Sequence, residues 1–284
     1  MKYGIREICD VVLKAKADVK VGNKDFAAGQ PVLYFDTLKT STMEGAATTV
    51  YAQGGRGNSR LVAWEGERTV TFTMEDALIS DMGLAVLTGA GLIEATESQK
   101  ITIHSTAKFA KGAKFEIDEE VDKTQSTWAM EMDEKDNILK TTKLETSAVT
   151  GGAGTNSTFT YNITEAKAVK VMFDFYIKKG TGARQIEITP DKFGGNYYLE
   201  ASTLFRDQNG TDMPAEFIIP NCKVQSNFNF SLASTGDPST FTFTMDAFPD
   251  YTVYDPTKKV LSVIQVVTEA DGAPLADPVA VNAD

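Results

Sequence analysis

Few residues in this sequence have the type and spacing that catalysis requires. The single histidine, His104, follows the alternating stretch Ile101-Thr102-Ile103, so we expect it at the end of a strand. One histidine cannot build a histidine-rich zinc site, and no Gly-x-Ser-x-Gly elbow accompanies it to support a Ser-His-Asp triad. We therefore predict that the protein is not an enzyme.

Two glycine clusters also lack the context of a binding site. The segment Gln53-Gly54-Gly55-Arg56-Gly57-Asn58 has neither the Gly-Lys-Ser/Thr ending of a P-loop nor the spacing of a dinucleotide fingerprint. It predicts a flexible loop, because glycine clusters most often mark turns. The second cluster, Gly151-Gly152-Ala153-Gly154, predicts a linker or a hairpin tip.

Acidic residues are numerous, but their spacing does not match a calcium site. The densest run, Glu116 to Asp122, lacks the Asp-x-Asn/Asp-x-Asn/Asp-Gly pattern of an EF-hand loop. From Lys111 to Asp136, nine acidic and four basic residues give a local net charge of −5. This indicates either an ordinary solvated face or a dedicated electrostatic surface. We expect no metal and no cofactor.

Charge and composition limit the classes of partner. The 284 residues include 28 basic and 39 acidic side chains, a net charge of −11, which argues against clamping a phosphate backbone. No apolar run approaches the roughly 20 residues that cross a bilayer, and the first residues lack a signal peptide's apolar region. We therefore expect the protein to be made in a cytoplasm and not to associate with a membrane. Cys9 and Cys222 should then be reduced and buried.

Alternation with a period of two is the strongest pattern in the chain. In the N-terminal stretch, Val11, Leu13, Ala15 and Ala17 fall on one face, and lysines fall on the other. Similar alternation occurs at 70–74, 158–164, 169–178, 227–232 and 241–245. Strands with one apolar face and one Thr/Asn/Lys face predict antiparallel sheets with a single buried side.

One helix and a division of the chain complete the expected architecture. A helix is expected at about 75–88, with Gly89 as its stop, flanking the sheet in a mainly β, α+β fold. Residues 1–110 and 151–267 are predicted to form the β core. The segment 111–150 is predicted to be a charged insertion, and 268–284 a loose C-terminal arm.

Three stretches resemble the tail tube proteins of large tailed bacteriophages, especially contractile-tailed ones. The first runs from Ala63 to Ser80 and reads AWEGERTVTFTMEDALIS. The second is Tyr197 to Asp207, YYLEASTLFRD, and the third is Phe217 to Val224, FIIPNCKV, which leads into GDPSTF from Gly236. The likeness covers 1–110 and 165–267, whereas 111–150 has no counterpart in it.

The resemblance implies a β-sandwich or small barrel with one flanking helix, and a structural subunit of the phage tail tube. Six copies would form a ring whose inner strands make a continuous β-barrel, and rings would stack into a conduit for genome delivery. The implied partners are further copies of the chain, a tail sheath protein, a tape-measure protein, and DNA that passes without specific binding. The implied location is the virion tail, assembled in the host cytoplasm.

Within such a tube, two sets of residues are candidates for particular roles. An acidic lumen would repel phosphates and let DNA slide, so we expect Glu65 and Glu67 to face the channel. We expect the strand with Val11, Leu13, Ala15 and Ala17 to join a neighbouring subunit, since free strand edges pair readily with another chain.

Two other functions remain open from the sequence. The chain could be another virion β protein, such as a capsid decoration protein or a tail terminator. It could also be a monomeric ligand-binding β-sandwich in which exposed aromatic residues stack on sugars. The candidates for that role are Trp64, Trp128, Tyr197 and Tyr198.

Overall fold

A computed structural model describes residues 2–5, 7–151, 156–229, 234–235 and 240–267. The chain divides into two compact units, the first formed by Met1–Leu92 with Ile186–Asp284 and the second by Ile93–Gln185. The segment 111–150 lies within the second unit, which extends beyond it at both ends. The predicted C-terminal arm, 268–284, lies outside the described residues.

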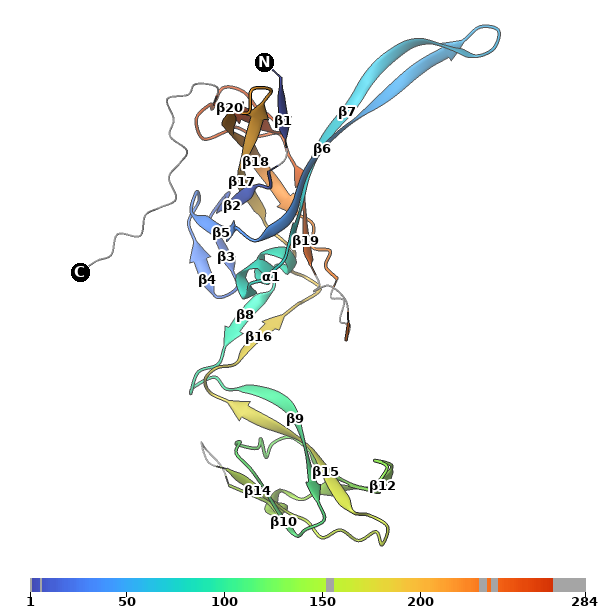
Figure 1. Cartoon of the computed structure of the whole chain (residues 1–284), viewed down its shortest axis with the longest axis vertical. Helices are drawn as coiled ribbons and strands as arrows, with labels where there is room; N and C mark the ends of the chain where they lie inside the picture. The colour runs from blue at the N-terminus through green and yellow to red at the C-terminus, as the bar shows by residue number, and fades with distance from the viewer. Residues whose placement is uncertain (1, 6, 152–155, 230–233, 236–239, 268–284) are drawn as a thin grey trace, which may run out of the picture. The chain divides into compact units, whose positions relative to one another are not determined.

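The first unit is built on a nine-stranded antiparallel sheet (Figure 1). Its strands are β1 (Tyr3–Ile5), β2 (Asp10–Ala15), β5 (Pro31–Phe35), β6 (Leu38–Gly54), β7 (Ser59–Asp76), β17 (Asn196–Asp207), β18 (Asp212–Val224), β19 (Phe241–Ala247) and β20 (Val263–Val266). The order is β5-β2-β17-β18-β19-β7-β6, with β1 added to β17 and β20 added to β18. The sheet is therefore open, and the single chain does not close the predicted small barrel.

The single α-helix among the described residues, α1 (Asp81–Thr88), starts later than the sequence pattern predicts. Strand β7 continues to Asp76, whose carboxylate accepts hydrogen bonds from the Thr37 hydroxyl at 2.5 Å and the Leu78 N–H at 3.2 Å. The helix then begins where the Ser80 hydroxyl accepts a bond from the Gly83 N–H. Gly89 ends it in the left-handed conformation, which confirms the predicted stop.

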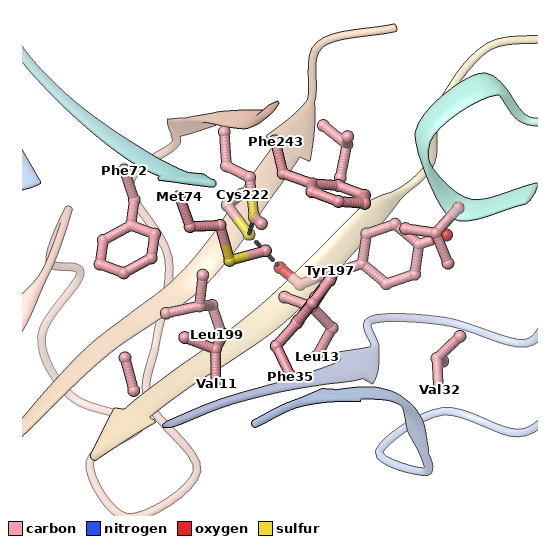
Figure 2. Packing of buried hydrophobic residues seen from close by; sticks show 14 of the residues in the cluster. Val11, Leu13, Val32, Phe35, Phe72, Met74, Tyr197, Leu199, Cys222 and Phe243 are labelled. Carbon is pink, nitrogen blue, oxygen red and sulfur yellow. Dashed lines mark hydrogen bonds between the residues drawn. The ribbon is translucent and has the colours of Figure 1, made fainter. Parts of the chain in front are cut away.

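The core of the first unit lies between one face of the sheet and the helix. Val11, Leu13 and Ala15 of β2 are buried there, as the alternation predicted for one face of this strand. Figure 2 shows the surrounding cluster, to which β17 contributes Tyr197 and β19 contributes Phe243. The helix adds Ala85, Val86 and Leu87, and the short hairpin of β3 (Val19–Val21) and β4 (Lys24–Phe26) adds Val21.

Both cysteines are free thiols and buried, as predicted. The Cys222 thiol donates a hydrogen bond to the Tyr197 carbonyl at 3.3 Å. Burial raises the pKa of Cys222 to about 12, so the thiol stays protonated and unreactive at neutral pH. Cys9 is buried as well, and burial also raises the pKa of its thiol.

The second unit is a separate β-sandwich with its own core. One sheet has the order β12-β11-β15-β9 and the other β10-β14-β13. The strands are β9 (Ile101–Ala110), β10 (Lys114–Ile117), β11 (Thr127–Met132), β12 (Ile138–Leu144), β13 (Val149–Thr150), β14 (Ser157–Thr160) and β15 (Lys170–Lys179), with a 3₁₀ turn at Thr146–Ala148. Phe115, Phe159, Phe173 and Phe175 pack between the sheets.

The chain passes between the units through β8 (Gly91–Glu94) and β16 (Arg184–Glu187), which pair with each other.

A buried carboxylate holds the loop between β14 and β15 in the second unit. The side chain of Glu131 in β11 is fully buried and accepts hydrogen bonds from the N–H groups of Thr164 and Glu165 and the hydroxyls of Tyr161 and Thr164. Burial alone would raise the pKa of this carboxyl. The hydrogen bonds to the ionised form outweigh burial and lower the pKa to about 2.

Replacing Glu131 with glutamine is expected to destabilise the second unit by on the order of 2–3 kcal/mol at pH 7. Because the folded pKa lies below the ordinary value of 4.5, the ionised carboxylate stabilises the fold above pH 4.5. This stabilisation is lost as the pH falls from 4.5 towards 2, and glutamine should remove that part of the pH dependence. Denaturant unfolding followed by Trp128 fluorescence, in a Trp64→Phe background, measures the effect in this unit. If the Glu131→Gln variant and the wild-type chain are equally stable at pH 7, the stabilising role of this carboxylate is contradicted.

Candidate assembly interface

The longest pair of strands extends beyond the rest of the first unit. Strand β19 pairs with β7 only from Thr71 to Asp76, so residues 59–70 of β7 pair only with residues 45–54 of β6. We call residues 45–70 the projecting hairpin; at about 3.3 Å per residue its strands are about 30–40 Å long. Figure 1 shows that it points away from the other strands of the unit. Among the described residues, neither outer edge of the projecting hairpin has a strand partner.

A glycine-rich turn closes the projecting hairpin. Gly55, Gly57 and Asn58 all have positive φ, and the Asn58 N–H donates to the Gly55 carbonyl at 3.2 Å. The Asn58 side-chain amide also donates to Gln53 at 3.3 Å. The glycine cluster at 53–58 is thus a tight turn, which confirms that it is a loop and explains its composition, since glycine adopts positive φ at no steric cost.

One face of the projecting hairpin is apolar and exposed. Val50 lies opposite Trp64 and Ala52 lies opposite Val62, so these four side chains share a face. Trp64 is 55% exposed, Val50 63% and Val62 49%, although such side chains normally lie in a core or an interface. We call these four residues the apolar face of the projecting hairpin.

The opposite face is mixed in character. Thr49 lies opposite Glu65 and Tyr51 lies opposite Ala63. The Arg60 guanidinium stacks 4.0 Å from the centre of the Tyr51 ring, a cation–π contact that holds both side chains near the tip. The projecting hairpin therefore has one apolar face and one mixed face, and both are exposed among the described residues.

Charge also separates the projecting hairpin from its surroundings. It has three of the chain's six arginines and two glutamates, a net charge of +1. The second unit has 13 basic and 14 acidic residues, which leaves −10 of the total −11 on the first unit. Outside the projecting hairpin, the first unit therefore has a net charge of −11. The projecting hairpin and the rest of the first unit therefore have net charges of opposite sign.

Such a hairpin needs partners for its stability. A two-stranded ribbon is marginally stable in water, because three or more strands or a packed face are needed to fix it. Long exposed edges are also ready templates for pairing, and proteins usually blunt them. Among the described residues, the edges of the projecting hairpin are long and its apolar face is exposed.

An irregularity near the middle of the projecting hairpin depends on a glycine. Between the pairs Ala47–Arg68 and Thr49–Glu65 the register shifts by one residue, as in a β-bulge. The Thr48 hydroxyl lies directly over Gly66 and accepts a hydrogen bond from the Glu67 N–H at 2.9 Å. A Cβ atom at position 66 would overlap that hydroxyl, so only glycine preserves this bond.

A Gly66→Val substitution is expected to displace Thr48, break its bond to Glu67 and loosen the outer part of the projecting hairpin. Amide hydrogen exchange of residues 49–65 in the unassembled chain should increase several-fold. Gly45→Val is the matched control, because a Cβ at Gly45 meets nothing within 4 Å and valine favours strands. Equal exchange in both variants would show that the bulge does not depend on Gly66.

The sequence-predicted site residues fall into two groups. Glu65 and Glu67 both lie exposed on the projecting hairpin. Val11, Leu13 and Ala15 have at most 1% exposure in the core, and β2 already pairs with β5 on one side and β17 on the other. Ala17 lies in an exposed bend after β2. Strand β2 therefore has no free edge for another subunit, because β5 and β17 occupy both edges, and its apolar residues pack in the core of their own unit.

The residues considered for chemistry form no catalytic group. His104 lies within β9, not at a strand end, and its Nε2 is 2.6 Å from the Asp174 carboxylate on β15. Tyr197 and Tyr198 are buried, whereas Trp64 and Trp128 are partly exposed on different units. Within the described ranges, no group of three or more His, Cys, Asp or Glu side chains is arranged to hold a metal ion. No helix there is long and apolar enough to cross a membrane.

The sequence did not reveal the apolar face of the projecting hairpin. Two signals could have found it: the glycine-rich turn between two β-prone segments, and the unbroken apolar run Leu61-Val62-Ala63-Trp64 on its return strand. Within the described residues, the open sheet and the projecting hairpin define a mainly β protein with long exposed strand edges.

Residues 4–260 match the family model described as the YomU/Tube protein family. The chain belongs to this family and is a phage tube-type structural protein, a component of the virion tail. No curated protein matches the sequence.

Proposed function

We propose that this protein is the repeating subunit of a hollow phage tail tube, the conduit for genome delivery into the host. The observation that supports the proposal is the projecting hairpin, whose two outer edges and apolar face are open in a single chain. Family membership supplies the second support, because it makes a tube the assembly to which such an element would contribute.

Association of different edges generates a ring or a helical stack. The open sheet ends in β5 on one side and in β6 on the other, so its two free edges differ in sequence and length. A contact between unlike surfaces joins copies head to tail, and it closes into a ring when the rotation allows. Closure removes every free edge. We propose hexameric rings that stack into the tube, following the resemblance to tail tube proteins.

The charge of the chain supports a passive conduit. A first unit of net charge −10 would surround DNA with a repulsive field, so the polymer slides instead of adhering. Glu65 and Glu67 remain our candidates for lumen-facing carboxylates, since both are exposed on the projecting hairpin. We propose a tape-measure protein in the lumen before DNA, and a tail sheath protein outside if the tail is contractile.

Negative-stain electron microscopy of the purified chain over a range of protein concentrations tests the proposal. We expect hollow rods with a stained central channel, and ring-shaped end views. Particles that stay monomeric at all concentrations and salt conditions, or filaments without a channel, would overturn the tube assignment. A capsid decoration protein or a sugar-binding module would remain as small discrete particles.

A further inference from the structure

A second exposed apolar surface lies on the first unit, in the segment that follows β19. Phe248, Tyr251, Val253 and Tyr254 are 44%, 40%, 76% and 52% exposed. We call residues 248–256 the aromatic loop. Four large apolar side chains in nine residues are unusual on a protein surface and mark a contact site, because single exposed apolar residues are common but clusters are not.

The aromatic loop is held in place by its own bonds. The Phe248 N–H donates to the Asn221 carbonyl at 2.8 Å, and Asp250 exchanges two backbone hydrogen bonds with Val260 at 2.9 and 3.1 Å. Lys16 of the segment after β2 pairs with the Asp250 carboxylate at 2.9 Å. A preformed apolar surface loses little conformational entropy when a partner binds, which favours tight contact.

We propose that the aromatic loop of one copy receives the apolar face of the projecting hairpin of another copy. This inference rests on the proposed function, because it names the surface on which the hairpin of a tube subunit docks. Each chain has both surfaces, and the projecting hairpin points away from its own unit (Figure 1). A contact between unlike surfaces on identical chains propagates from copy to copy.

The chemistry of the two surfaces is complementary. The projecting hairpin offers Trp64, with Arg56 in its turn, and the aromatic loop offers two tyrosines and a phenylalanine. Tryptophan, tyrosine and arginine are the residues that most often dominate binding energy at interfaces. The Lys259 ammonium lies 5.3 Å from the Tyr251 ring centre, a cation–π contact at the edge of the aromatic loop. The net charge of +1 on the projecting hairpin also favours a surface of the remaining first unit, which has −11.

Two charged variants test the pairing. Trp64→Asp places a carboxylate on the apolar face, and Val253→Asp places one on the aromatic loop. Both positions are exposed in the single chain, so both variants should fold. The controls are Ala63→Asp, on the opposite face of the same strand, and Val253→Leu, which keeps the loop apolar. Assembly is followed by light scattering and mass photometry, and folding by thermal melting.

We expect each charged variant alone to need at least a tenfold higher concentration to assemble, whereas both controls assemble as the wild-type chain does. A mixture of the two charged variants should form a discrete complex that contains both, because each keeps the surface that the other lacks. This complex should not grow, because every other junction lacks one intact surface.

Three results would overturn the inference. If Val253→Asp assembles normally, the aromatic loop has another occupant, and the tube proposal stands. If both variants fail alone and their mixture forms no joint complex, the two surfaces do not bind each other. If Trp64→Asp assembles normally, the role of the projecting hairpin fails as well.

Discussion

Replacing Leu13 with aspartate is expected to prevent the chain from folding. Leu13 is fully buried between the sheet and the helix, in a strand whose two edges are paired. An unpaired carboxylate there has neither water nor a cation, and the loss of several kcal/mol is comparable with the whole stability of a domain. Circular dichroism and the soluble yield of the purified chain measure the outcome.

The matched control is Ala17→Asp, four residues along the same stretch. Ala17 lies in an exposed bend, so its replacement should leave stability within about 0.5 kcal/mol of the wild-type chain. If Leu13→Asp instead gives a folded monomer that has only lost assembly, then β2 is an inter-subunit strand, as the sequence alone had suggested.

Shortening the projecting hairpin is expected to abolish tube formation and leave the fold intact. In this variant an Asn-Gly turn joins Gly45 to Val70 and replaces the residues between them. The hairpin contributes none of the buried core residues, so the melting temperature should change by no more than a few degrees. Assembly should disappear at every accessible concentration, because the two unpaired edges of the projecting hairpin and its apolar face are removed together.

Electron microscopy and thermal melting of the shortened variant, beside the wild-type chain, provide the test. Rods of normal diameter from the shortened variant would show that the projecting hairpin is dispensable for the tube. A large fall in melting temperature would show that it supports its own unit instead of another copy.

The sequence predicted the local features of the fold better than their long-range arrangement. The alternation of Val11, Leu13 and Ala15 identified a buried strand face, and Gly89 identified the end of the helix. The start of α1 was predicted too early, because Glu75 and Asp76 fit a helix N-terminus as well as a strand end. Which strands pair depends on contacts such as Phe243 with Met74, which lie far apart in the chain and leave no local pattern.

The assembly surface was hard to predict for a physical reason. Period-two alternation reports a strand with one face in its own core and one face in water. Residues 45–54 and 59–70 lie outside that core. Buried and exposed side chains therefore do not alternate along these strands, which include Val50 and Trp64. The apolar residues of β2 were predicted to contact a neighbouring subunit, because sequence alone does not distinguish burial within a chain from burial between chains.

The sequence gives the net charge of the chain, but it did not show which unit holds the excess of acidic residues. The acidic run within 111–150 suggested an external charged surface, yet Asp122 is buried and pairs with Lys178 at 2.9 Å. The lysines of the second unit, together with Arg184, balance its acidic residues to a net charge of −1. The acidic excess therefore belongs to the first unit, where an effect on DNA passage would arise.

Hydrogen–deuterium exchange of the projecting hairpin, compared between the unassembled chain and sedimented assemblies, tests most directly whether other copies complete its open edges. The account predicts that outward-facing amides of residues 45–54 and 59–70 exchange rapidly in the single chain and become strongly protected on assembly, while core amides such as Leu199 stay protected in both. Assemblies in which these hairpin amides exchange as fast as in the single chain would contradict it.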